Sequence, residues 1–188
     1  MRILTKEECE IENGFISEKI SRGAIFIHPT DTIYGLGCNA LRAESVKKIR
    51  EIKESYQNPF SIIAPSKEWI LKNCHINEKG KEWLNKLPGP LTLILKLKNK
   101  DCIVKEVNNG LDTLGVRISD NWFSEFIKWL KLPTITTSVN KTGNDFMTSL
   151  EDLDSGIKGN VDFIIYDGEK KGRPSEIVDL TKGKVIDR

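Results

Sequence analysis

Polar side chains with spacings that suit binding of small charged molecules gather in a few segments. Residues 28–40 read HPTDTIYGLGCNA, with hydroxyls, a carboxylate and glycines but no period of a regular element. Residues 136–143 read TTSVNKTG, where backbone N–H groups at a glycine turn can hold phosphate oxygens. Arg117 ends the apolar run TLGVR and must reach solvent or find an anion. Each segment alone is also compatible with ordinary turn chemistry.

Residues 35–40 satisfy the GxGxxA pattern of dinucleotide-binding loops. That pattern requires the glycines to lie directly at the turn from strand to helix, whereas residues 28–34 intervene here. We therefore expect the glycines to permit close backbone approach or a positive φ rather than to bind a dinucleotide.

Lysines allow two interpretations. Lys53 lies near the end of an expected helix, where a cation is favoured in any case. Lys96, Lys98 and Lys100 share one strand face that could touch RNA, but a solvated strand face explains them more simply.

Composition indicates a globular chain of one domain, residues 1–188, with 38% hydrophobic and 30% charged residues. The net charge of +2 argues against a main role in coating nucleic acid. Apolar runs are too short to span a membrane, and the early acidic residues do not suit a secretory signal, so we expect a cytoplasmic protein. With four scattered cysteines and two histidines, we expect reduced thiols and no zinc site.

Hydrophobic periodicity predicts an α/β (α+β-like) fold, a twisted mixed β-sheet flanked by helices. Helices are expected at residues 6–21, 44–54 and 78–87, around Trp69, at 122–130, and in a short segment capped by Ser149. Strands are expected at residues 24–27, 60–64, 91–97, 113–118, 134–139, 161–166, 176–180 and 184–186.

Taken in order, the motifs resemble one family, the YrdC-type threonylcarbamoyl-AMP synthases. HPTDTIYGLGCNA is similar to the family's PT-[ED]-T-x-YGLG segment, and the helix ending at Lys53 to its motif helix. LPGPLTLIL, TLGVRIS, TTSVNKTG and GRPSEIVDL resemble the family's later motifs. PFSIIAPSKEWI looks most like the short archaeal versions that lack a second domain.

The resemblance implies a YrdC-like fold with a concave nucleotide-binding cavity. It implies a nucleotidyltransferase that makes threonylcarbamoyl-AMP and pyrophosphate from L-threonine, bicarbonate and ATP, with Mg²⁺ on the triphosphate. A tRNA-modifying transferase complex would then use the product. Family roles place Thr30, Tyr34, Arg117 and Ser175 around threonine. They place Lys53, Thr113, Ser138, Asn140, Thr148 and Arg188 around ATP, with no catalytic nucleophile and no protein-held metal.

The chain departs from the family pattern at several positions. The family reads lysine–x–arginine where this chain has Lys53-Glu54-Ser55, and the segment to Pro59 is one residue shorter. Arg22 or Arg50 could replace the absent arginine, and the sequence does not choose between them. Ile63 stands where longer members carry a histidine, and Glu176 where the family has a threonine.

Two other functions remain open at this point. One is an RNA-binding module, with contact to tRNA or double-stranded RNA on a concave surface. The other is a nucleotide-binding paralogue similar to YciO, with weak or no synthase activity, which the changed segment at Lys53 keeps in consideration.

Overall fold

The structure is a computed structural model that describes residues 1–186. Its centre is an 11-stranded mixed sheet, ordered β1-β9-β2-β3-β8-β4-β7-β6-β10-β11, with β5 pairing to β6. The strands are β1 Arg2–Leu4, β2 Phe26–His28, β3 Gly35–Gly37, β4 Ser61–Ile63, β5 Cys74–His75, β6 Leu91–Leu97, β7 Thr113–Arg117, β8 Thr134–Ser138, β9 Phe163–Ile165, β10 Glu176–Asp179 and β11 Lys184–Ile186. The α/β fold class with a mixed sheet is confirmed.

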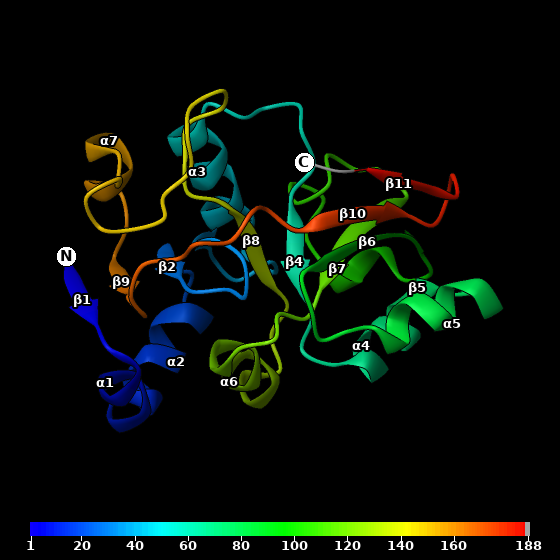
Figure 1. Cartoon of the computed structure of the whole chain (residues 1–188), viewed down its shortest axis with the longest axis horizontal. Helices are drawn as coiled ribbons and strands as arrows, with labels where there is room; N and C mark the ends of the chain where they lie inside the picture. Colours follow the sequence, from blue (N-terminus) through cyan, green and yellow to red (C-terminus); the bar gives the residue numbers. More distant parts are fainter. Residues whose placement is uncertain (187–188) are drawn as a thin grey trace.

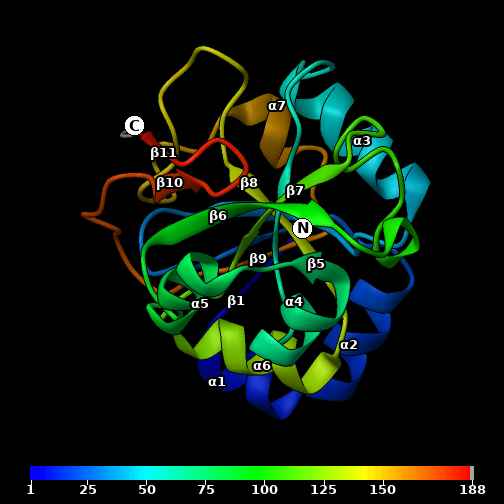
Figure 2. The ribbon, with the colours of Figure 1, turned by 90° about the vertical axis from the view of Figure 1, so that its right-hand side faces the viewer.

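Helices cover both faces of the sheet (Figures 1 and 2). The helices are α1 Lys6–Ile11, α2 Asn13–Ser21, α3 Ala43–Lys53, α4 Lys67–Asn73, α5 Glu78–Asn85, α6 Trp122–Leu130 and α7 Ser155–Lys158. Helices α3 and α7 lie on one face, and α1, α2, α4, α5 and α6 lie on the other. Among the described helices, none is both long and apolar enough to span a membrane.

Two hydrophobic clusters hold these layers together. The larger one joins the central strands to α3 and α7, through residues such as Val46, Ile49 and Ile157. The second lies under α1, α2 and α6, where Phe26 stacks on Phe163 with ring centroids 5.2 Å apart. Burial of these apolar faces fixes the sheet between its helices.

Two helix predictions were wrong. Residues 6–21 form two helices, because the backbone at Glu12 leaves helical geometry (ψ 18°) and Gly14, a poor helix former, follows. The Glu12 carboxylate is held by Arg2 of β1 through hydrogen bonds of 2.6 and 2.7 Å. Ser149 caps no helix; its N–H and hydroxyl both donate to Asp152, while Asp154 caps α7.

Strand β3 was not predicted, because its glycines give no alternation of apolar side chains. It lies inside the segment expected to be a loop and pairs antiparallel with both β2 and β8. The segment of residues 28–40 is therefore a loop only in part, and its second half belongs to the sheet. The short strands β1 and β5 were also missed.

Candidate functional site

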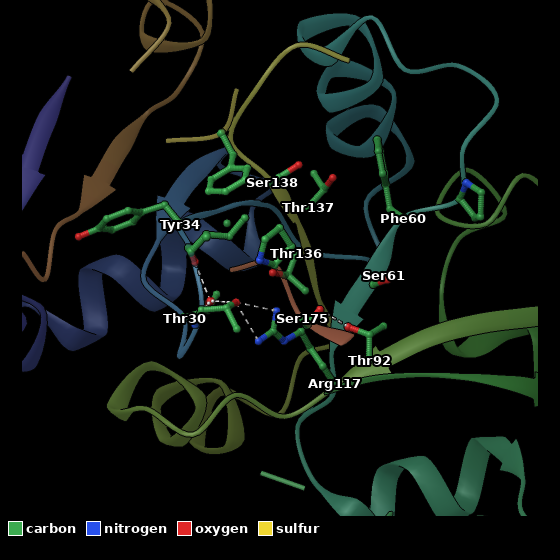
Figure 3. Close-up of a pocket in the computed structure, with 16 residues that line it drawn as sticks. Thr30, Tyr34, Phe60, Ser61, Thr92, Arg117, Thr136, Thr137, Ser138 and Ser175 are labelled. Carbon is green, nitrogen blue, oxygen red and sulfur yellow. Dashed lines mark hydrogen bonds between the residues drawn. The ribbon is translucent and has the colours of Figure 1, made fainter. Parts of the chain in front are cut away.

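A cavity of about 250 Å³ opens where β3, β8, β4, β7, β6 and the segment just before β10 converge. Hydroxyl side chains form much of its wall, and they are Thr30, Thr32, Ser61, Thr92, Thr136, Thr137, Ser138 and Ser175. Phe60 and Phe146 add apolar surface, and Arg117 is the charged residue among the described lining residues (Figure 3). Such a wall can bind oxygen-rich ligands by hydrogen bonds and anchor one negative charge at the arginine.

Arg117 ends β7 and is 5% exposed. Its guanidinium pairs with the carboxylate of Asp31, and both terminal nitrogens donate to the Thr32 hydroxyl at 3.4 and 3.5 Å. The other Asp31 oxygen accepts the Asp120 N–H at 3.0 Å. The anion that the sequence required for Arg117 is therefore Asp31, in the motif three residues before Tyr34.

Thr30 and Thr32 shape the turn that carries Asp31. The Thr30 hydroxyl donates to the Ile33 carbonyl at 2.6 Å and accepts the Thr32 N–H at 3.1 Å. Hydroxyls that bond back to nearby backbone in this way stabilise tight turns. Thr30 thus lines the cavity and also holds its neighbour in place.

Tyr34 lines the cavity, but its hydroxyl is directed away from Arg117 (Figure 3). The hydroxyl donates to the Gly168 carbonyl at 2.6 Å and accepts the Asp167 N–H at 2.9 Å. Burial raises the pKa of Tyr34, so the phenol stays protonated. Tyr34 therefore shapes the site by anchoring the segment that leads to Ser175.

The glycines of β3 make room for neighbouring side chains. A Cβ on Gly35 would lie 2.6 Å from the His28 ring and 2.8 Å from the Thr136 hydroxyl. A Cβ on Gly37 would lie 2.7 Å from the Ile135 carbonyl. Neither glycine has a positive φ. Of the two expected reasons for glycine here, close approach is correct and a positive φ is not.

Lys53 ends α3 and lies beneath the segment that follows β8. Its ammonium group donates to the carbonyls of Ser138 at 2.5 Å and Asn140 at 2.6 Å, and to the Asn140 side-chain oxygen at 3.1 Å. The Ser138 hydroxyl donates to that same oxygen at 2.6 Å. Lys53 is 4% exposed, and burial lowers its pKa to about 8. The structure thus brings Lys53, Ser138 and Asn140 together as one polar network.

Of the remaining predicted site residues that the structure describes, one lines the cavity and two do not. The Ser175 hydroxyl is in the cavity, 2.8 Å from that of Thr92. Thr113 shares a strand face with Arg117 but is outside the cavity lining. Thr148 is also outside that lining, and its hydroxyl donates to Asp152 at 2.6 Å. Arg188 lies outside the described residues.

Neither arginine suggested as a replacement lines the cavity. Arg50 is buried and donates to the backbone carbonyls of Ser55, Asn58, Glu106 and Val107. Its guanidinium also lies 4.3 Å from the centre of the Phe60 ring. Arg22 is paired with Glu18 on α2, at 2.7 Å and largely in solvent. Ser55, which stands at the position of the family arginine, is buried. Because Arg50 donates to the carbonyls of Ser55 and Asn58, it holds this shortened segment in place.

Several lining residues were missed in the sequence. Ser61 and Thr92 are strand residues, and hydroxyl side chains are ordinary on the exposed face of a strand. Thr136 and Thr137 belonged to the candidate segment at residues 136–143 but were given no role of their own. Asp31 lay within the quoted motif but was given no role. The unusually hydroxyl-rich strand at residues 134–139 was the available signal in the sequence. That this strand lies between β3 and β4, where its hydroxyls line the cavity, follows only from the strand order of the sheet.

The comparisons with known proteins agree with these motifs. The sequence profile of the Sua5/YciO/YrdC family, described as telomere recombination, matches residues 18–188. A Methanocaldococcus jannaschii protein provisionally named threonylcarbamoyl-AMP synthase is 35% identical, over 97% of this chain and 87% of its own length. The chain therefore belongs to the Sua5/YciO/YrdC family.

Solved structures share the fold. Sua5 of Pyrococcus abyssi, crystallised with L-threonine, superposes with a TM-score of 0.84 at 30% identity, covering 96% of this chain and 54% of that chain. This chain thus spans about half the length of that protein. YciO of E. coli superposes with a TM-score of 0.84 over 98% of this chain and 92% of its own, and at 20% identity it shows the fold alone.

Proposed function

We propose that this chain is an L-threonylcarbamoyladenylate synthase, a nucleotidyltransferase acting on L-threonine, bicarbonate and ATP. The observation that carries the proposal is the hydroxyl-lined cavity with Arg117 at its base. Support comes from the 30% identity to a Sua5 crystallised with L-threonine. The product would serve a tRNA-modifying transferase complex, and we place the enzyme in the cytoplasm as a single domain.

In this proposal Arg117 binds the carboxylate of threonine, because a guanidinium suits that group. Thr30, the Tyr34 backbone and Ser175 close the pocket around the amino acid. Ser138 and Asn140 face ATP, and Lys53 holds their loop from below through the ammonium contacts described above. Thr113, Thr148 and Arg188 are proposed ATP contacts farther out.

The reaction makes two bonds and breaks two, a C–O bond of bicarbonate, whose oxygen leaves as water, and the α–β phosphoanhydride of ATP. The threonine nitrogen joins the carbon of bicarbonate with loss of water, an oxygen of the resulting carbamate joins the α-phosphorus of ATP, and pyrophosphate leaves. No side-chain nucleophile is required, so the protein contributes placement of the reactants and fixed dipoles around the developing charge. The converging hydroxyls and Arg117 supply both.

Mg²⁺ fits this site as part of the substrate rather than as a resident ion. Among the described residues, no group of three or more His, Cys, Asp or Glu could hold a metal ion. The described lining residues carry hydroxyls and no carboxylate. We therefore propose that Mg²⁺ enters on the triphosphate of ATP, with water completing its coordination.

Pyrophosphate release from ATP and bicarbonate, measured with and without threonine, tests the proposal. The purified chain should release pyrophosphate only when threonine is present. Arg117→Ala should abolish the threonine-dependent release of pyrophosphate. Arg22→Ala, which removes a surface guanidinium, should leave that release intact. Threonine-dependent turnover that survives Arg117→Ala would show that the carboxylate assignment is wrong.

The other two functions gain no support from this site. The cavity lining has a single charged side chain among the described residues, which does not suit a surface built for RNA phosphates. YciO shares the fold without sharing enough sequence to carry an activity. If the chain binds ATP but shows no threonine-dependent turnover, a nucleotide-binding paralogue with weak or no synthase activity would be favoured instead.

A further inference from the structure

Asp31 is a largely buried carboxylate next to the guanidinium of the cavity. Its side chain is 9% exposed, and that of its partner Arg117 is 7% exposed. One oxygen pairs with Arg117 and the other accepts the Asp120 N–H at 3.0 Å. Asp31 is absent from the cavity lining, although Thr30 and Thr32 on either side belong to it. The carboxylate is therefore placed to act on Arg117 rather than to touch a ligand.

This position determines the net charge of the pocket. Arg117 contributes one positive charge to the described lining, and the adjoining Asp31 contributes one negative charge. Among the described residues, Arg117 and Asp31 together contribute a charge of about zero at this position. Two charges a few ångströms apart interact strongly when they are partly buried, so the ligand is exposed to both.

A zwitterion and an anion respond differently to this pair. An α-amino acid binds Arg117 through its carboxylate, which Asp31 repels, but its ammonium group is attracted by the same Asp31 charge, so the two effects largely cancel. Phosphate or pyrophosphate carries several negative charges, which Asp31 repels, and it brings no positive charge in return. Repulsion of this kind discriminates between ligands that would form similar hydrogen bonds.

We propose that Asp31 is a specificity-determining residue that reserves the Arg117 position for a zwitterionic amino acid and excludes phosphate and pyrophosphate from it. The inference rests on the proposed function, in which the same cavity handles threonine and releases pyrophosphate. Because Asp31 neutralises the charge of Arg117, the released pyrophosphate does not occupy the position that binds threonine.

Competition binding on the wild-type chain, without ATP or turnover, gives the first test. Threonine binding is measured by calorimetry in the absence and presence of inorganic phosphate and then of pyrophosphate. The affinity for threonine should change little when inorganic phosphate or pyrophosphate is added. Displacement of threonine by phosphate at similar affinity would overturn the inference alone, whereas failure of threonine to bind would contradict the proposed function itself.

Variants give the second test. Asp31→Asn removes the charge and keeps an acceptor for the Asp120 N–H, so the preference for threonine over pyrophosphate should fall by about tenfold or more. Asp31→Glu keeps the charge and should restore most of that preference. Asp162→Asn is the matched control, because Asp162 also accepts a backbone N–H, that of Ile25 at 2.8 Å, and is not among the residues lining the cavity.

The ratio of the two affinities separates specificity from structure. If Asp31→Asn weakens threonine and pyrophosphate equally, Asp31 is a structural partner only and the inference is wrong. Thermal unfolding of each variant identifies a folding defect. If Asp31→Asn does not fold, the wild-type competition experiment decides the question by itself.

Discussion

Removing the ammonium group of Lys53 should disorganise the Ser138–Asn140 loop while lowering the free energy of unfolding by no more than about 2 kcal/mol. Lys53→Met keeps most of the aliphatic stem, so packing under the loop is largely retained. What disappears is the donor of three hydrogen bonds, to the Ser138 carbonyl and to two oxygens of Asn140. These acceptors belong to the segment that we propose to bind ATP.

The expected magnitude follows from two opposing terms. Hydrogen bonds from a charged donor contribute about 1.5–3 kcal/mol each, and breaking a buried charged network costs about 3–5 kcal/mol in total. Against this, burial lowers the pKa of Lys53 from 10.5 to about 8, which corresponds to about 3 kcal/mol for keeping the charge inside. The free energy of unfolding should therefore fall by only about 0–2 kcal/mol.

ATP binding has no such compensation. Without the ammonium group, Ser138 and Asn140 are displaced from the positions that bind ATP. Displacement of binding groups lowers the affinity roughly 10- to 100-fold. The assay is steady-state pyrophosphate release with ATP and threonine varied separately, together with chemical denaturation. The KM for ATP should rise by about 10- to 100-fold, and the KM for threonine should change by much less.

The matched control is Lys48→Met, which removes an exposed lysine from the same helix. It should leave both KM values and the stability unchanged. An unchanged KM for ATP in Lys53→Met would refute the reasoning, since the loop would then hold its shape without the ammonium group. Equal losses for ATP and threonine would instead indicate a general defect of the cavity.

Two further predictions concern pH and the β3 strand. Because the pKa of folded Lys53 is about 8, the KM for ATP should rise as the pH passes 8, and this rise should be absent in Lys53→Met. Between pH 8 and 10.5 the unfolded chain holds the Lys53 proton more tightly than the folded chain, so this group's contribution to the free energy of unfolding should increase, which denaturation across that range measures. Gly35→Ala places a methyl 2.6 Å from the His28 ring and should lower stability by about 1–3 kcal/mol. Gly14→Ala meets nothing within 4 Å, lies in α2 and should be neutral or stabilising, and equal melting temperatures for the two variants would contradict the packing argument.

Much of the secondary structure follows from local pattern. The alternation of residues 91–97 predicts the strand that the structure has as β6, with the same bounds. Thr5 and Glu8 predict the capping box, which is present with hydrogen bonds of 2.7 and 3.2 Å. Failures occur where the pattern is weak: two of the three residues of β3 are glycines, and Gly14 is the one local signal of the break at Glu12.

The sequence by itself also determined the candidate site residues and the requirement that Arg117 find an anion. The candidate site residues came from the family that the contiguous motifs resemble, and the requirement at Arg117 came from its place on an apolar strand. The family followed from six such motifs taken in order, and the fold class followed from the intermixed helix and strand patterns.

Only the tertiary structure decided what these residues contact. The order β3-β8-β4-β7-β6-β10 brings together hydroxyls that are far apart in the chain, such as Thr30 and Ser175. It also directs the Tyr34 hydroxyl to residue 168, the Lys53 ammonium to the loop after β8, and Arg117 to Asp31. These partners lie between 80 and 140 residues away, and such pairings depend on strand order and burial. No local pattern of residues encodes them.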